Sequence, residues 1–522
     1  MRVVYRRRRE QNPVHKRGKA RDIRIGILIP IPYRAAISSL FLHYAYIALN
    51  SLEGVVAYRY VYDMASDTLE SLDTSEPITK LDALLVSLPF ELDYVSLARI
   101  ELELGLAPRK GFSKPIVIAG GVAPSANPLP LTNLVDAVVI GDAEPVLESI
   151  AYAVADEPSH AMKELEDLNC IYIPQTGGKA RRCVAEDLDR APHPVQQIVP
   201  LDEEPVYGYG LRIEVSRGCR RFCAFCLEGH VSIPFRYRSL AVLKRIAEIG
   251  LEYQPRRRVV IYSLSLFDIP HATQFLEYLA ENSIEASIPS LRPDYLDRDR
   301  IELIYRLGQR TLTVAPETMV RDLGCAIGKC VDRERVVELA LDSFRIGFSH
   351  LKLYLVLGFP CEDTSRSIDE VKRFVEDLRR LGISRAKFIR FSINPLIPKP
   401  WTPLQNLAPS HVLKLGSVLE KARDVLTTPI SEVEVMDVEW GFAQAVIALG
   451  SSRTSELIME WGLRGLGIRG FREAFERCRE FLRYVDSGWD TPPWIDAVEA
   501  PLPLHYFENR FGFLSRSLCS RR

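Results

Sequence analysis

The feature that most constrains this chain is an alternation of continuous apolar runs and helical segments, which occurs in two separate series. In the first series the apolar runs lie at 24–30, 55–61, 82–88, 114–121 and 135–142. Helical stretches such as 35–50 and 92–105 lie between them. Strands that are apolar on both faces and alternate with helices indicate a parallel sheet covered on both sides. We therefore predict an α/β protein whose residues 23–155 form a Rossmann-like, doubly wound sheet.

The second series has more and longer units than another small open sheet would need. Its apolar runs lie at 211–216, 258–264, 284–290, 310–316, 350–358 and 386–394. The clearest helix between them is 365–381, where apolar residues recur at helical spacing and Gly382 follows as a stop signal. Six strand–helix units predict a partial (β/α)6 barrel over 206–405. The active sites of such barrels lie on the loops after the strands.

The remaining segments are less regular. Residues 156–205 read as a connector with a hairpin near 170–178, and 406–522 as a mainly helical C-terminal extension near the barrel opening. Residues 1–22 are rich in Arg and Lys and lack a core-forming pattern, which predicts a disordered, solvated basic arm. An electrostatic contact between this arm and RNA is the alternative.

Composition excludes several classes of protein. The formal net charge is −1, so no overall attraction to nucleic acid or membrane is expected. No apolar run is long enough to span a bilayer, and the basic N-terminus lacks the apolar stretch of a secretory signal. Seven of the ten cysteines are scattered without a visible disulfide framework. We therefore expect a cytoplasmic protein in a reducing compartment.

The other three cysteines lie close together, in the sequence SRGCRRFCAFC at 216–226. Cys219, Cys223 and Cys226 follow the first strand of the second series, at the mouth of the predicted barrel. Three thiolates leave one corner of a [4Fe–4S] cluster open to another ligand. The alternative is a structural zinc site, in which His230 supplies the fourth ligand.

This C-x3-C-x2-C loop resembles the radical S-adenosylmethionine (radical SAM) superfamily. The resemblance implies that the three cysteines hold a [4Fe–4S] cluster whose open iron binds S-adenosylmethionine. It implies reductive cleavage to a 5′-deoxyadenosyl radical, which takes a hydrogen atom from a substrate that the sequence does not identify. It also implies an electron donor of the ferredoxin or flavodoxin type. It assigns no catalytic residue beyond the cofactor sites.

Further motifs follow in the order that this family has. They imply that four residues contact S-adenosylmethionine: Phe225, Glu317, Gly358 and Glu362. The family's Gly-Gly-Glu motif is absent after the second strand, where SLSLFD stands at 263–268. Ser263 or Ser265 is the substitute candidate for the contact with the amino group of the cofactor.

The N-terminal region resembles the cobalamin-binding-like domain that precedes the barrel in one branch of the family. The stretches at 115–131 and 135–150 carry the likeness. They imply that a corrinoid, if bound, lies at Gly120 and Gly121, and that the chain is then a cobalamin-dependent radical SAM methyltransferase. The Asp-x-His-x-x-Gly motif for cobalt is absent, and His43 is interpreted as a packing or surface residue inside a helix.

Several other residues have two interpretations each. Cys325, Cys330 and Cys361 follow barrel strands and are either structural or ligands of an auxiliary cluster. Arg236 and Arg238 either cap strand ends or bind an anion, whereas Arg292 and Lys399 are candidates for cofactor or substrate contacts. A zinc-stabilised RNA-binding protein remains the alternative outside the enzymes.

Overall fold

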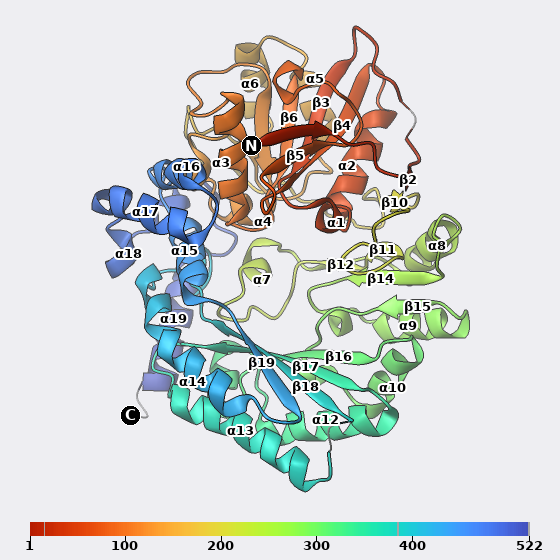
Figure 1. Cartoon of the computed structure of the whole chain (residues 1–522), viewed down its shortest axis with the longest axis vertical. Helices are drawn as coiled ribbons and strands as arrows, with labels where there is room; N and C mark the ends of the chain where they lie inside the picture. Colours follow the sequence, from red (N-terminus) through yellow and green to blue (C-terminus); the bar gives the residue numbers. More distant parts are fainter. Residues whose placement is uncertain (15, 384–385, 520–522) are drawn as a thin grey trace.

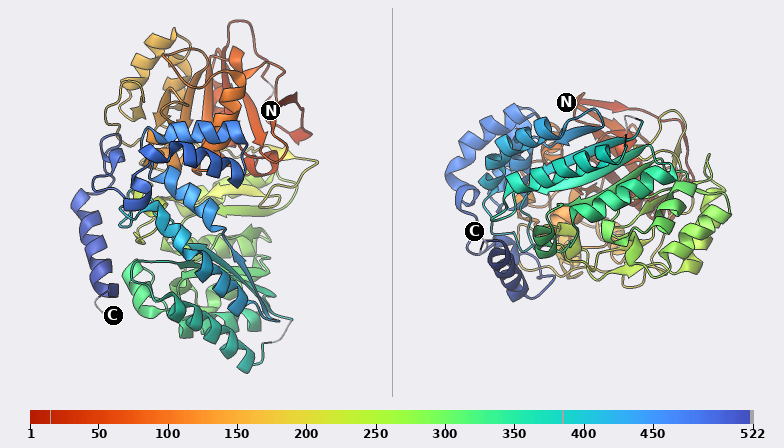
Figure 2. Two further views of the ribbon diagram at one scale, coloured as in Figure 1. Left: turned by 60° about the vertical axis from the view of Figure 1, so that its left-hand side comes forward. Right: turned by 90° about the horizontal axis from the view of Figure 1, so that it is seen from below.

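The computed structural model describes residues 1–14, 16–383 and 386–519. It places two α/β parts end to end, with C-terminal helices along one side (Figures 1 and 2). No helix among the described residues has the length and apolar character needed to cross a membrane.

The N-terminal part is a sheet with the strand order β1-β5-β4-β3-β6-β7-β8-β9. Its parallel centre comprises β3 (Ile23–Ile29), β4 (Val55–Asp63), β6 (Ala83–Ser87), β7 (Ile116–Gly120) and β8 (Ala137–Val139). The helices include α1 (Tyr33–Ala36), α2 (Leu40–Ser51), α3 (Asp93–Leu104), α4 (Val122–Ala126), α5 (Leu147–Ala153) and α6 (Pro158–Glu166). The central strands are buried along almost their whole length, which explains their continuous apolar sequences. The doubly wound sheet is confirmed.

The basic arm is ordered, which corrects the prediction of disorder. Strand β1 (Arg2–Tyr5) pairs in parallel with β5 (Thr68–Ser71), and β2 (Glu10–Gln11) pairs with β10 (Val199–Pro200). A carboxylate of the sheet pairs with two arginines of the arm. Arg6 and Arg8 pair with Glu70 at 3.1 and 2.6 Å, and Glu10 pairs with the buried Arg59 at 2.8 Å. A basic segment therefore folds here because carboxylates far away in the sequence meet it.

The barrel consists of two parallel sheets. One contains β11 (Leu211–Glu214), β14 (Arg258–Tyr262) and β15 (Glu285–Ser287), and the other contains β16 (Thr311–Glu317), β17 (His350–Leu357), β18 (Phe388–Pro395) and β19 (Ser431–Val435). A single bridge between Leu291 and Val314 joins them. Its helices include α8 (Leu240–Leu251), α9 (Ala272–Glu281), α10 (Arg298–Arg306), α12 (Arg333–Ile346), α13 (Thr364–Arg380) and α14 (Gly416–Leu426). All six predicted strand positions hold a strand, and β19 adds another beyond the predicted limit at 405.

The C-terminal extension is mainly helical, as predicted, but much of it packs on the N-terminal part. Helix α16 (Thr454–Arg464) lies against α3, followed by α17 (Ile468–Cys478). At its end, α19 (Leu504–Cys519) returns to the barrel, where it contacts α11 (Arg321–Ile327). The limits 23–155 and 206–405 remain our proposed division of the chain, with β19 assigned to the barrel.

Candidate functional site

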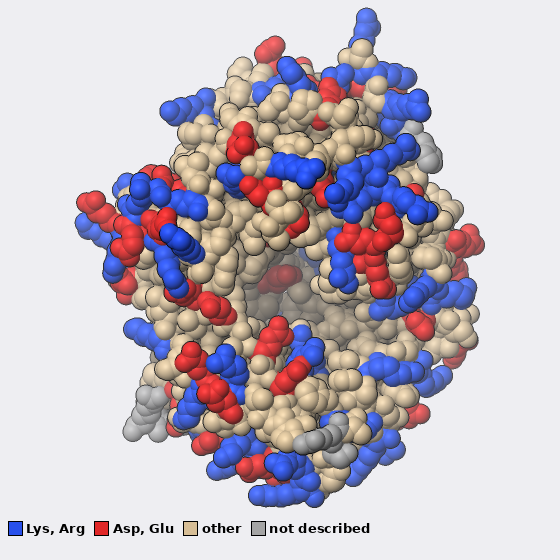
Figure 3. Space-filling model, viewed as in Figure 1, with Lys and Arg blue, Asp and Glu red and all other residues tan. Residues whose placement is uncertain are grey.

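The carboxyl ends of the strands in the N-terminal sheet face those of the barrel strands, and the cysteine loop lies between them. Residues at the carboxyl ends of β6, β7 and β8 line one cavity together with Glu214 and Arg217, which end the first barrel strand and begin the cysteine loop. Figure 3 shows this face hollowed at its centre, where Figure 1 draws α7 (Leu227–Val231), the helix that follows Cys226. Ligands of parallel α/β sheets bind at these strand ends.

The three predicted ligands are unpaired. Cys219 and Cys226 are partly exposed, Cys223 is buried, and none of them forms a disulfide. Burial raises the pKa of the Cys219 thiol, and raises that of Cys226 to about 12. Thiols in such a setting stay protonated at neutral pH unless a cation binds them.

The loop that carries the cysteines is fixed from both ends. Gly218 has φ +78°, and a Cβ there would lie 2.3 Å from the carbonyl oxygen of Ser232. Arg217, beside it, forms ion pairs with Glu214, Glu144 and Asp142 at 2.8, 2.7 and 3.0 Å.

Arg221 fixes the same loop from the other side. Its Nε donates to the Asp268 carboxylate at 3.0 Å, and the guanidinium lies 4.7 Å from the ring centroid of Tyr295. The Asp268 side chain is 1% exposed. Sequence reasoning missed Asp268, although it is the final residue of the segment SLSLFD that replaces the Gly-Gly-Glu motif.

The position of His230 does not suit a zinc ligand. Its Nδ1 lies 2.8 Å from the carbonyl oxygen of Cys226, and its Nε2 lies 3.4 Å from the Tyr506 hydroxyl. The thiols of a mononuclear zinc site lie about 4 Å apart, since each Zn–S bond is about 2.3 Å. Among the described residues the cysteine triplet does not form a group with all ligand atoms within 4.8 Å.

The residues assigned to S-adenosylmethionine meet beside this loop. The rings of Phe225 and Phe359 contact edge to face at 5.9 Å, and Phe359 follows Gly358 in the turn after β17. Gly358 has φ +102°, a conformation that favours glycine. The Glu362 carboxylate accepts from the backbone N–H groups of Gly358 and Phe359 at 2.6 and 2.9 Å. These contacts of Glu362 hold the turn, and its predicted contact with the cofactor stays a prediction.

Glu317 lies in an irregular part of β16 and is paired. Its carboxylate accepts from Lys329 Nζ at 2.6 Å, and Lys329 also donates to the carbonyl oxygen of Ala315 at 2.8 Å. Sequence reasoning missed Lys329, which lies between two cysteines and 12 residues beyond its partner. The weak candidate Ser263 shares a hydrogen bond with Ser216 at 2.7 Å, and Ser265 Oγ is buried without a hydrogen-bond partner.

Of the arginine and lysine candidates, some make structural contacts and one lies beside a predicted cluster ligand. Arg238 donates to the carbonyl oxygens of Glu214 and Leu188 and is structural. Arg236 pairs with Asp142 at 2.6 Å, and Lys399 with Glu91 at 2.6 Å, so both join the N-terminal part to the barrel. Arg292 reaches Cys223, as described below.

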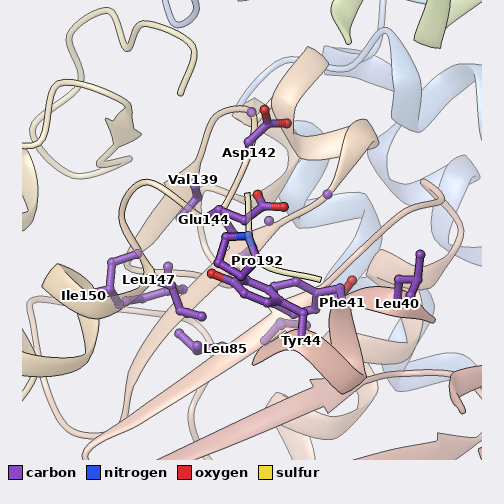
Figure 4. A pocket seen from close by; sticks show the side chains of 18 of the residues that line it. Leu40, Phe41, Tyr44, Leu85, Val139, Asp142, Glu144, Leu147, Ile150 and Pro192 are labelled. Carbon is purple, nitrogen blue, oxygen red and sulfur yellow. The ribbon is translucent and has the colours of Figure 1, made fainter. Parts of the chain in front are cut away.

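Gly120 and Gly121 line a cavity of ≈ 310 Å³ at the edge of the N-terminal sheet (Figure 4). Its lining includes Phe41 and Tyr44 of α2, Leu147 and Ile150 of α5, and Leu85, Ile118 and Val139 of the central strands. Gly121 has φ +126°, and a Cβ there would lie 2.6 Å from the Leu88 carbonyl oxygen. Asp142, Glu144, Glu214 and Arg217 form an ionic rim toward the barrel. An adjoining cavity of ≈ 350 Å³ shares Tyr44 and Glu144.

His193 also lines both cavities and was not predicted. Its Nε2 lies 3.1 Å from the carbonyl oxygen of Arg212. Burial and the nearby Arg238 lower the pKa of His193 to about 3, so the ring is neutral at physiological pH. The sequence signal was a histidine between two prolines in the connector. His43, by contrast, is fully buried with both nitrogens hydrogen-bonded, as a packing residue.

The remaining cysteines correct the expectation that the chain has no disulfide framework. The structure pairs Cys170 with Cys183, Cys325 with Cys330, and Cys361 with Cys519. Cys325, Cys330 and Cys361 are therefore not gathered as ligands of an auxiliary cluster. The third pair joins residues 158 positions apart, which the fold and not the spacing brings together. Disulfides persist mainly in oxidising compartments, so cysteine usage no longer argues for a reducing one.

Comparison with known families decides what this loop belongs to. The sequence model of the radical SAM superfamily matches residues 213–399, and that of the N-terminal part of radical SAM proteins matches 43–174. The chain belongs to the radical SAM superfamily. The uncharacterized protein MJ0966 of Methanocaldococcus jannaschii is 29% identical over 384 residues, which cover 73% of this chain and 79% of that protein.

Two solved structures of radical SAM enzymes resemble the chain. The methyltransferase TsrM of Kitasatospora setae, with cobalamin and a [4Fe–4S] cluster bound, has a TM-score of 0.54 at 14% identity, over 88% of this chain and 100% of that one. The cobalamin-dependent enzyme OxsB, with aqua-cobalamin and S-adenosylmethionine bound, has a TM-score of 0.47 at 13% identity, over 96% and 79%. At these identities the likeness to TsrM is one of fold.

Membership confirms the expected class of protein. The chain is a radical SAM enzyme, which uses a [4Fe–4S] cluster and S-adenosylmethionine and needs a reducing electron donor. Its N-terminal part has the cobalamin-binding-like architecture expected from the sequence.

Proposed function

We propose that Cys219, Cys223 and Cys226 ligate three irons of the cluster, and that the fourth iron binds S-adenosylmethionine. When bound, the cluster supplies the electron that cleaves S-adenosylmethionine and releases a 5′-deoxyadenosyl radical. The observation that carries the assignment is the unpaired state of these three thiols on one loop at the mouth of the barrel. Six other cysteines of the described chain are in disulfides.

In this proposal the chain's own residues bind and orient the cofactor. Phe225 and the turn at Gly358–Phe359 form an apolar wall suited to adenine, and Glu362 holds the backbone of that turn. Glu317 offers a carboxylate to the ribose or amino acid part, with Lys329 fixing its position. Arg217 and Arg221 hold the cysteine loop still.

EPR of anaerobically reconstituted, dithionite-reduced protein tests this assignment. A [4Fe–4S]+ signal that changes when S-adenosylmethionine is added would support an open iron. Replacing any of the three cysteines by Ala is expected to remove the cluster iron. Cys478→Ala is the matched control, because Cys478 is also a buried unpaired thiol but lies on α17. One zinc per chain and no cluster would contradict the proposal.

We further propose that the cavity at Gly120 and Gly121 receives a corrinoid, which makes methyl transfer the favoured reaction. The cavity has an apolar interior, and its rim carries three carboxylates against one arginine. This rim disfavours polyphosphate cofactors such as dinucleotides but accepts amide donors, which corrinoids carry around the ring. The neutral His193 offers one more polar contact. The fold likeness to a cobalamin-bound methyltransferase supports the same ligand.

The absorbance of protein purified anaerobically from cobalamin-supplied cells tests the corrinoid. We expect a retained corrinoid spectrum in the wild type, and its loss in Leu85→Trp, which fills the cavity. Leu504→Trp is the control, since Leu504 is an exposed leucine on α19. Protein that retains no corrinoid, yet gives the EPR signal, would overturn this second proposal alone.

A further inference from the structure

Arg292 lies against the cysteine loop and points one nitrogen at a sulfur. It precedes a short 3-10 turn (Pro293–Tyr295) after β15, and its Nη1 donates to Cys223 Sγ at 3.4 Å. Its Nη2 donates to the carbonyl oxygen of Gly328 at 3.1 Å. The side chain is 9% exposed, and Cys223 is 7% exposed. The guanidinium therefore bridges a predicted cluster ligand and the backbone of a separate loop, away from bulk water.

The loop on the far side of Arg292 is itself fixed. Gly328 has φ +96° and ends α11, and a Cβ there would lie 3.4 Å from the Cα of Cys223. The pair Cys325–Cys330 closes this loop, and Lys329 anchors it to Glu317. Arg292 thus reaches Cys223 from a rigid support, so its distance to the sulfur is well defined.

A purely structural role does not account for this geometry. Asp294 pairs with Arg292 at 3.0 Å, but the Asp294 side chain is 35% exposed, and water weakens an ion pair on that side. That pair engages Nε and Nη2 and does not require Nη1 to point at a thiol. An arginine guanidinium stays protonated throughout the physiological pH range. The guanidinium is therefore always charged beside the sulfur.

Arg292 donates to both members of a close contact between Cys223 and Gly328. The Cys223 thiol and the Gly328 carbonyl face each other at 3.9 Å. Once the thiol ionises to bind metal, a negative sulfur faces a carbonyl oxygen, and two acceptors repel. Arg292 donates to both through the two arms of its fork, which is the geometry that a guanidinium provides and an ammonium does not.

We propose that Arg292 is a positioning residue that raises the reduction potential of the cluster through its hydrogen bond to Cys223. Hydrogen bonds to ligating sulfurs withdraw electron density and favour the reduced state, and they are among the levers by which proteins set these potentials. A fixed positive charge beside the thiolate acts in the same direction. The inference rests on the proposed ligation by Cys219, Cys223 and Cys226.

The test is an EPR-monitored redox titration of reconstituted protein without S-adenosylmethionine. We expect Arg292→Met to make the reduced cluster about tenfold less favourable, a lowering of the midpoint potential by ~59 mV for one electron. Arg292→Lys keeps the charge but loses the fork, so its midpoint potential should lie between those of the wild type and Arg292→Met. Arg300→Gln is the matched control. Arg300 lies over Phe267 and donates to the Tyr295 carbonyl in the same region, but its described contacts include no sulfur.

The outcomes separate this inference from the proposed function. Wild-type protein without any [4Fe–4S]+ signal would refute the ligation itself. A wild-type signal with the same midpoint in Arg292→Met would overturn only the role of Arg292, and so would an equal shift in Arg300→Gln. If Arg292→Met fails to assemble a cluster, the midpoint potential of Arg292→Lys is the test. An Arg292→Lys midpoint equal to that of the wild type would refute the need for the fork.

Discussion

The buried Asp268 carboxylate has Arg221 as its only cationic partner among the described contacts, and this pair fixes the cysteine loop. Arg221→Met leaves Asp268 with the Tyr295 hydroxyl alone. We expect a loss of roughly 3 kcal/mol in unfolding free energy, at the low end for broken buried pairs because Arg221 is 34% exposed. Thermal unfolding of the apo protein and iron content per chain are the measurements.

The control for Arg221 is an exposed pair of the same type. Arg390 and Glu432 are 54% and 44% exposed and join β18 to β19. Arg390→Met should change stability by less than about 1 kcal/mol and leave the iron content unchanged. Equal effects of the two variants would refute the role of the Arg221–Asp268 pair.

Asp93 gives a pH dependence whose sign can be worked out. Burial and the neighbouring Glu91 raise the pKa of Asp93 to about 7. A carboxyl group with a raised pKa in the fold stabilises it fully below the unfolded pKa of about 3.9, and this contribution is lost as the pH rises toward 7. Asp93→Asn should therefore remove part of the decline in Tm between pH 4 and 7. The control is Asp424→Asn, because Asp424 is 77% exposed; an unchanged pH slope in Asp93→Asn would contradict the assignment.

At the scale of elements, the turn after β7 combines two constraints on one residue. Gly121→Ala meets a left-handed backbone and a carbonyl oxygen 2.6 Å from the new Cβ. Gly105→Ala is the matched control, since Gly105 ends α3 at φ +69° with open space around it. We expect the unfolding free energy to fall by about 1 kcal/mol in the control and by roughly 2–4 kcal/mol in Gly121→Ala. Gly121→Ala should also retain corrinoid more weakly. Equal costs would mean that the close approach to Leu88 is relaxed without penalty.

Elements whose burial is continuous could be predicted from sequence, and those defined by pairing could not. The apolar runs at 23–29 and 116–120 are strands buried in a sheet, and their composition shows it. Strand β19 reads SEVEV and is only half-buried, so its charged residues resembled a loop or helix. Strand β1 reads RVVY and is exposed; it forms because β5 offers a free edge.

At the scale of the whole molecule, the cysteine triplet could be predicted because its spacing is local, but its surroundings could not. Asp268 bonds to Arg221, which lies 47 positions away along the chain. Lys329 bonds to Glu317, 12 positions away, and Glu144 to Arg217, 73 positions away. Polar residues at such separations carry no periodic signal, and only the fold brings them together. The same is true of the N-terminal cavity, whose rim takes residues from both the sheet and the barrel.

Arg217 joins the two halves of the molecule where the two proposed ligand sites meet. It pairs with Asp142 and Glu144 from the N-terminal part and with Glu214 from the barrel, and it lies two residues before Cys219. Burial works to lower the pKa of Arg217, but Glu214 and Glu144 outweigh it and raise the pKa. Removing the cation leaves like charges facing each other across the boundary between the two halves.

Arg217→Met should therefore uncouple the N-terminal sheet from the barrel. We expect calorimetry to show two unfolding transitions in place of one, with proteolytic cleavage in the connector that the wild type resists. Arg333→Met is the matched control, because Arg333 is 20% exposed against 19% for Arg217 and pairs with three carboxylates that all lie within the barrel. It should lower the barrel's stability without splitting the transition. The same single transition in both variants would mean that packing, and not this ion cluster, holds the two halves together.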